Sequence, residues 1–253
     1  GANLFGVKIR GANFREANFL RASMSEAEMF ETAFHHATFS ETKLNGARMF
    51  ACDAQAADFR KARIDGMVIE GTQLAAARLD GMDLTVLSTK GLSLIRANLT
   101  NATLTGMDMN GWRMEQARLE KAELSNAKLE GANLEGANLS WARMRRVRLQ
   151  GAQLANANAQ NAIISHSNFT SADLSGADLR SADLKFSKFK GADCSRCLFK
   201  SADLRNADFK EAKLKGAKLW GSRVGKTKLP GSAFHWELLL GLFGGLAAPK
   251  TKD

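Results

Sequence analysis

The sequence contains no tyrosine and few of the residues on which catalytic and metal sites usually depend. It has two prolines, three cysteines and four histidines in 253 residues. Both prolines, Pro230 and Pro249, lie near the C-terminus, so the preceding chain keeps its backbone donors. No hydrophobic run is long enough to span a bilayer, and the first residues lack the pattern of a secretory leader. These absences argue against a membrane protein and against a disulfide-stabilised fold.

What the chain does contain is a five-residue repeat. An apolar residue recurs at nearly every fifth position from Leu4 to Phe234, and the residue two positions earlier is nearly always small. Ala132-Asn133-Leu134 is a typical example. A period of five fits neither a helix nor a strand, but it fits a four-sided coil in which each repeat supplies one side and one corner. Four repeats then make one coil, and successive coils lie about 4.8 Å apart.

This pattern resembles that of the pentapeptide-repeat family, Ala-(Asp/Asn)-(Leu/Phe)-X-X, over about nine-tenths of the chain. The resemblance implies an all-β fold, a right-handed quadrilateral parallel β-helix of about 11–12 coils with a solid core of Leu and Phe. We expect this β-helix over residues 1–232, a short apolar cap, helical, over 233–248 and a disordered tail at 249–253.

The segment after the last regular repeat is densely apolar. Its candidate cap or dimer contacts are Phe234, Trp236, Leu239, Leu240 and Phe243. A repeat fold exposes its open end, so a cap over that end is the first interpretation. A cap that also dimerises and an anchor on a membrane surface are the alternatives.

The small inward position is enlarged in one region of the repeat. The enlarged residues are Met67, Met82, Leu87, Leu92, Met107 and Trp112. In the same region the central position, usually Leu or Phe, is occupied by the smaller and polar Thr89. Large side chains at the small inward position can replace the volume lost at the central position, because protein cores keep a nearly constant packing density. We therefore predict a repacked core with a bulge or bend near residues 82–95, and a binding notch there is the functional alternative.

The residues that could carry chemistry fall at unsuitable positions. The register places Cys194 and Cys197, which are spaced like half of a metal site, in the core. Buried thiols of this kind are inert, and no further zinc ligands lie nearby in sequence. His35, His36 and His166 fall on outward positions, where we interpret them as solvated. We expect no catalytic residue, metal, cofactor or small-molecule substrate.

The formal net charge of +10 is concentrated in the last third of the chain. Between residues 180 and 228, fourteen Lys and Arg accompany five Asp and Glu. The candidate surface for an anionic partner consists of Arg180, Lys185, Lys190, Lys200, Arg205, Lys210 and Lys215. A solvated surface, partly neutralised by Asp183 and Asp203, is the structural interpretation. An acidic protein, a nucleic-acid backbone or an anionic membrane is the functional one.

A second candidate surface is apolar and lies in the first coils. Outward Phe30 and Phe50 fall one coil apart on the same side, and Leu20 lies near them in sequence. Exposed apolar residues in a row can mark a contact face. A stacked aromatic pair that merely stabilises the coil is the alternative.

We weigh three functions. The leading hypothesis is a non-catalytic, rod-like scaffold or protein-interaction module with a protein partner, as the C-terminal part of a larger bacterial protein connected with secretion or an effector. The alternative is electrostatic binding of nucleic acid or an anionic membrane through the basic third. The third is DNA mimicry, the topoisomerase protection known in the family, which we rank last because Arg118, Lys121 and Lys128 interrupt the acidic residues. The expected location is the bacterial cytoplasm, or outside the cell for an effector.

Overall fold

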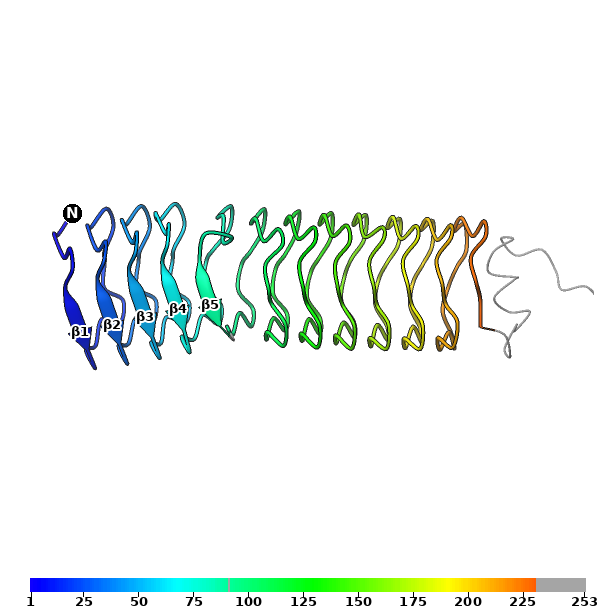
Figure 1. Ribbon diagram of the computed structural model, residues 1–253, viewed down its shortest axis with the longest axis horizontal. Helices are drawn as coiled ribbons and strands as arrows, with labels where there is room; N and C mark the ends of the chain where they lie inside the picture. The colour runs from blue at the N-terminus through cyan, green and yellow to red at the C-terminus, as the bar shows by residue number, and fades with distance from the viewer. Residues whose placement is uncertain (91, 231–253) are drawn as a thin grey trace, which may run out of the picture.

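The chain winds into a rod of stacked coils (Figure 1). The computed structural model describes residues 1–90 and 92–230. Its parallel bridges join residues twenty positions apart, from Asn3–Ser23 at one end to Asp208–Lys228 at the other. At twenty residues a coil, residues 1–230 make about eleven coils. The predicted all-β, four-sided β-helix is therefore confirmed.

Five short strands form one parallel sheet along one side of the first coils (Figure 1). The strands are β1 (Lys8–Arg10), β2 (Glu28–Phe30), β3 (Arg48–Phe50), β4 (Val68–Glu70) and β5 (Ser88–Lys90). They pair in chain order, as the succession of coils requires. Elsewhere in the described residues, each side of a coil is joined to the next by a single bridge residue, with two exceptions described below.

The bridge residues define four faces, which we number in chain order. Face I carries bridge residues from 3 to 223, and face II carries β1–β5 followed by residues 108 to 228. Face III runs from residue 13 to 213, and face IV from 18 to 218. Two residues lie at each corner between neighbouring faces. A residue number therefore fixes the face or corner on which a side chain lies.

The corners are tight turns with a left-handed residue. Ala137 N donates to Leu134 O at 2.9 Å, which closes a turn over the two corner residues. Gly136, the second of these, has a φ of 63°. Many repeats place other residues there, such as Trp141 with a φ of 62° and Arg146 with a φ of 57°. These residues accept a backbone conformation that costs about 1–2 kcal/mol relative to the right-handed form.

The core is a stack of the central and small inward residues. Phe169, Phe189 and Phe209 lie face to face on successive coils, with ring centroids 4.8 and 4.3 Å apart. Phe199 meets Phe189 and Phe209 edge-on. All four rings are buried. Each coil thus buries its apolar residues against its two neighbours, which is the packing expected of a solenoid.

Polar residues in the small inward position have a defined hydrogen-bond partner. The Thr42 hydroxyl donates to Phe19 O at 2.7 Å, and the Ser187 hydroxyl donates to Ile164 O at 3.0 Å. In each case the acceptor lies twenty-three residues earlier, at the turn of the adjoining coil. A buried hydroxyl costs free energy unless it is bonded, so these bonds explain why Ser and Thr replace Ala here.

The coil is irregular where the sequence predicts a bulge. Among the described residues, no bridge joins Arg63 to Asp83 or Ser88 to Asp108, although the neighbouring coils are bridged. Gly66 N donates to Val86 O, one residue later than the regular pattern would give. The predicted irregularity is therefore confirmed. It takes the form of one missing bridge on face I, one on face II and a one-residue offset at the corner between these two faces.

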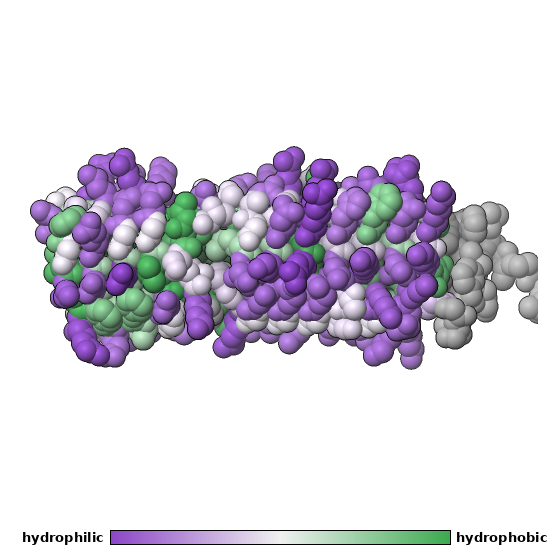
Figure 2. Space-filling model, viewed as in Figure 1, coloured by the Kyte–Doolittle hydropathy of each residue, from purple (hydrophilic) through white to green (hydrophobic). Residues whose placement is uncertain are grey.

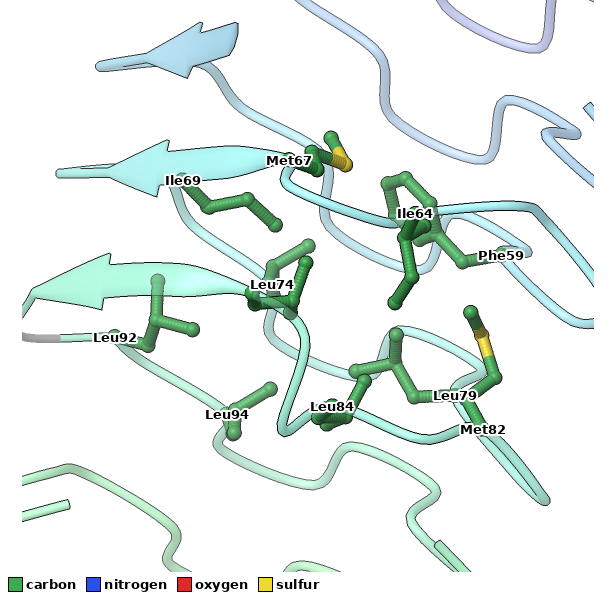
Figure 3. Close-up of a pocket in the computed structure, with 11 residues that line it drawn as sticks. Phe59, Ile64, Met67, Ile69, Leu74, Leu79, Met82, Leu84, Leu92 and Leu94 are labelled. Carbon is green, nitrogen blue, oxygen red and sulfur yellow. The ribbon is translucent and has the colours of Figure 1, made fainter. Parts of the chain in front are cut away.

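A small apolar cavity accompanies this irregularity. Side chains from three successive coils surround it, including Ile64, Leu74, Leu84 and Leu94 (Figure 3). Its volume is about 10 Å³. That is the lower limit for one water molecule, and a cavity of this size costs only about 0.2 kcal/mol. The cavity favours the repacked core over a binding notch.

The predicted C-terminal cap over 233–248, its contacts and the tail at 249–253 lie outside the described residues. Within residues 1–90 and 92–230, no helix has the length and apolar character needed to cross a bilayer.

Candidate interaction surface

The seven basic residues predicted to bind an anionic partner surround the rod. Arg180 and Lys200 lie on the corner between faces IV and I, and Lys185 and Arg205 lie between faces I and II. The remaining three occupy the corners on either side of face III, and they are Lys190, Lys210 and Lys215. The structure therefore brings four of the seven together along the two borders of face I.

Ion pairs neutralise part of this charge. Arg205 and Asp203 lie 2.6 Å apart, and Lys185 lies 3.3 Å from Asp183. The predicted neutralisation by these two aspartates is confirmed. Arg180 pairs in the same way with Asp178 at 2.6 Å. The partner lies two residues earlier in each case, on the flat side next to the corner.

The Asp203 carboxylate is the centre of a small charge cluster. The Arg205 side chain, hydrogen-bonded to Asp203, lowers the pKa of that carboxyl. Arg223, one coil later on the same face, lies 3.6 Å away and lowers the pKa further. Asp203 is therefore ionised throughout the neutral range, and from face I it pairs with both arginines.

The most exposed large apolar side chains of the described residues lie along one side of the rod. They are Phe5, Leu20, Val86, Trp141, Phe186 and Trp220. By the twenty-residue register, all six lie on the two corners that border face I, and none on the two corners that border face III. A chance arrangement would divide them between the two pairs of corners. Exposed apolar side chains gathered along one face are typical of a contact surface.

Two of these aromatic side chains interact with polar neighbours one coil away. The Lys200 ammonium lies 4.4 Å from the ring centroid of Trp220, a cation–π contact. The ring of Phe186 stacks on that of His166, with centroids 4.8 Å apart and planes 9° from parallel. His166 was predicted as a solvated surface residue, and the stack with Phe186 was not foreseen. The register could have indicated that the two rings are neighbours, because residues 166 and 186 are twenty positions, or one coil, apart.

The apolar surface predicted in the first coils is divided. Phe30 and Phe50 do stack, with ring centroids 5.2 Å apart, on the corner between faces II and III. Leu20 lies on the diagonally opposite corner, between faces IV and I. The structure therefore separates Leu20 from the two rings and places it with the face I residues. Figure 2 shows larger apolar areas on the N-terminal half of the face in view than on the C-terminal half.

The cysteines lie in the core, as the register predicts. Cys52, Cys194 and Cys197 are buried free thiols. The hydrogen bond with Cys197 and burial raise the pKa of the Cys194 thiol well above its ordinary value. Within the described part of the chain, no three His, Cys, Asp or Glu side chains are grouped so that they could hold a metal ion. His35 lies 3.2 Å from the Asp53 carboxylate instead of being simply solvated.

The chain is a four-sided solenoid whose core is filled and whose outward side chains form regular columns. Solenoid proteins of this kind use their extended surfaces for binding. Family models match most of this chain. A model described as pentapeptide repeat region matches residues 142–219, and one described as pentapeptide repeats matches 2–46, 97–136 and 113–151. The chain belongs to the pentapeptide-repeat family.

Solved structures of the same family resemble the chain. HetL of the cyanobacterium Nostoc sp. strain PCC 7120, a protein involved in heterocyst differentiation regulation, is 28% identical, with 92% of each chain covered and a TM-score of 0.41. QnrB1, a plasmid-mediated fluoroquinolone resistance protein, is 17% identical over 98% of this chain and all of its own, with a TM-score of 0.37. A protein of the Arabidopsis thaliana thylakoid lumen is 27% identical over 44% of this chain and 71% of its own, with a TM-score of 0.32. No curated protein matches the chain.

Proposed function

We propose that this chain is a non-catalytic scaffold that binds a protein partner along face I. The observation that carries the proposal is the gathering of the six exposed apolar side chains on the two borders of that face. Aromatic residues and arginine supply most of the binding energy at protein interfaces. Trp141, Phe186 and Trp220 provide the aromatic anchors, and Arg180 and Arg205 lie between them along the rod.

The shape of the rod fits this role. Eleven coils spaced about 4.8 Å apart make a face about 50 Å long. Successive side chains on that face keep their spacing, because every coil is hydrogen-bonded to the next. Members of this family act in general as structural or interaction modules, which agrees with a non-enzymatic role. A bacterial origin, and a place at the C-terminal end of a larger protein connected with secretion or an effector, are part of the same proposal.

The experiment compares two surface variants as baits in extracts of the source cell. The first replaces Trp141, Phe186 and Trp220 with serine, and the second replaces Lys190, Lys210 and Lys215, on the corners around face III, with serine. We expect a protein retained by the wild type to be lost by the first variant and kept by the second. Retention that is equal for the wild type and the aromatic variant would refute the assignment of face I.

Binding of nucleic acid or an anionic membrane through the seven basic residues is the second proposal. Because these residues are distributed over all four corners, a partner that meets a single face of the rod contacts only some of them. A DNA duplex or a vesicle of anionic lipid serves as the probe, with binding measured from 50 to 300 mM salt. Loss of affinity with salt, and with Lys190→Glu plus Lys210→Glu, supports this proposal, and a flat response excludes it. The acidic rows needed for DNA mimicry are interrupted on face I by Arg223 and at its border by Arg205.

A further inference from the structure

A surface depression of about 460 Å³ lies on the corner between faces I and II. Its floor is Ser165, whose side chain is only 6% exposed. Along the same column of corner residues, Arg145 lies one coil before Ser165 and Lys185 one coil after it. The short Ser165 side chain leaves a gap of about two coil spacings, or about 10 Å, between Arg145 and Lys185, and Ser125 and Asn126 extend the lining by one more coil. The depression therefore follows directly from the order Arg, Ser, Lys in this column.

The side chains around the hollow are strongly basic. Arg145, Arg146 and Lys185 line it, and Asp183 is the acidic residue among the lining side chains. Asp183 lies 3.3 Å from the Lys185 ammonium, so it neutralises part of the lysine charge. Two guanidinium groups remain, which gives the lining a formal excess of two positive charges when His166 is neutral.

The donors available to a ligand are side chains. The backbone N–H groups of Arg146 and His166 already donate to the carbonyls of Ser165 and Lys185, at 3.1 and 2.8 Å. Both arginine side chains are exposed to solvent beside the hollow. A guanidinium presents paired N–H donors in a planar fork, and this fork matches two oxygens of a phosphate or carboxylate group. The Ser165 hydroxyl adds a donor at the floor.

One wall of the hollow is aromatic. The stacked rings of His166 and Phe186 stand next to the cationic groups, and Phe186 is 49% exposed. The volume of about 460 Å³ is in the range of small-molecule sites and far exceeds that of a bare anion. A ligand that fills it therefore carries a double negative charge at one end and a flat, apolar group at the other.

We propose that this depression binds a phosphate monoester with an aromatic substituent. The phosphate, with a charge of about −2 near neutral pH, meets Arg145, Arg146 and Ser165, and the substituent packs on Phe186. Such a ligand can be a phosphorylated tyrosine side chain or a free nucleoside monophosphate. The chemistry recognised is the same for both. The inference does not depend on the protein partner proposed above, because small phosphate esters probe the site directly.

The experiment measures binding of phenyl phosphate to the full chain by calorimetry at low salt, with inorganic phosphate and phenol as comparison ligands. We expect saturable binding of phenyl phosphate, weaker binding of inorganic phosphate and none of phenol. Arg145→Gln and Arg146→Gln should each weaken binding about tenfold. Arg196→Gln is the matched control, because Arg196 shares the left-handed corner conformation of Arg146, with a φ of 60° against 57°.

Ser165→Arg separates a built site from general electrostatic attraction. This variant adds a positive charge but fills the hollow, and the column already holds arginine and lysine at its neighbours, so the coil should fold. If phenyl phosphate binds in the hollow, Ser165→Arg should abolish its binding. If it is only attracted to a basic surface, Ser165→Arg should bind it more tightly. Unchanged or tighter binding by Ser165→Arg would overturn the proposal, as would an equal effect of Arg196→Gln. A phosphotyrosine peptide and adenosine monophosphate, compared on the wild type, then identify the source of the phosphate.

Discussion

The stacked phenylalanines of the C-terminal half allow a sharp test of how the rod is held together. Phe189 is fully buried, stacks on Phe169 and Phe209 and meets Phe199 edge-on. Removing a buried phenyl ring typically costs 3–5 kcal/mol, and each aromatic pair adds about 0.5–1.5 kcal/mol beyond area burial. We expect Phe189→Ala to lower the free energy of unfolding by about 4 kcal/mol.

Phe186, in the same coil, is the matched control. It is the same residue type but points outward and is 49% exposed, so Phe186→Ala should cost less than about 1 kcal/mol. Urea unfolding followed by far-UV circular dichroism measures both losses. A loss below about 1 kcal/mol for Phe189→Ala, or equal losses for both variants, would refute this account of the core.

Three further predictions concern the corner, the charge cluster and the thiols. Gly111 has a φ of 67°, and a Cβ there would meet no atom within 4 Å, so Gly111→Ala should cost about 1 kcal/mol of backbone strain in urea unfolding. An unchanged midpoint would show that the turn relaxes. Because the native pKa of Asp203 is lowered, its ionic contribution to stability is present above the unfolded pKa, about 3.9, and is lost as the pH falls through the native value. Asp203→Asn should therefore reduce the dependence of the melting temperature on pH below about pH 4, and an identical profile would contradict the cluster. The Cys194 thiol, buried and with a raised pKa, should resist a thiol reagent at pH 8 until urea unfolds the chain, and rapid labelling of the native protein would contradict its core position.

The register alone predicts which residues are inside. It places Cys194, Cys197 and the enlarged Trp112 in the core, where the structure has them. It also predicts the irregularity, because Thr89 reduces the volume of the central side chain just where large residues occupy the small inward position. These predictions succeed because one rule, repeated in every coil, decides the inward positions, and the packing density of the core is nearly constant.

The surface is predicted less completely, for physical reasons. The grouping of Leu20 with Phe30 failed because nearness in sequence is not nearness on a four-sided coil, where ten residues lead to the opposite corner. The pairing of Arg180 with Asp178 and the stack of His166 on Phe186 depend on side-chain rotamers that the repeat does not specify. The depression at Ser165 requires the lengths of three side chains in successive coils to be compared, which a pattern of apolar and small residues does not record.

The twenty-residue period of the bridges has a consequence for how such a rod can change. Deleting or inserting a single repeat of five residues would leave the core rule intact but turn every later side chain by a quarter of a revolution about the axis. A deletion of one repeat between Phe186 and Trp220 would move Trp220 from the border of face I to the corner between faces III and IV. A deletion of four repeats would shorten the rod and keep each column aligned. The length of the rod is therefore free to vary in whole coils, whereas the composition of a binding face is sensitive to any other change in length.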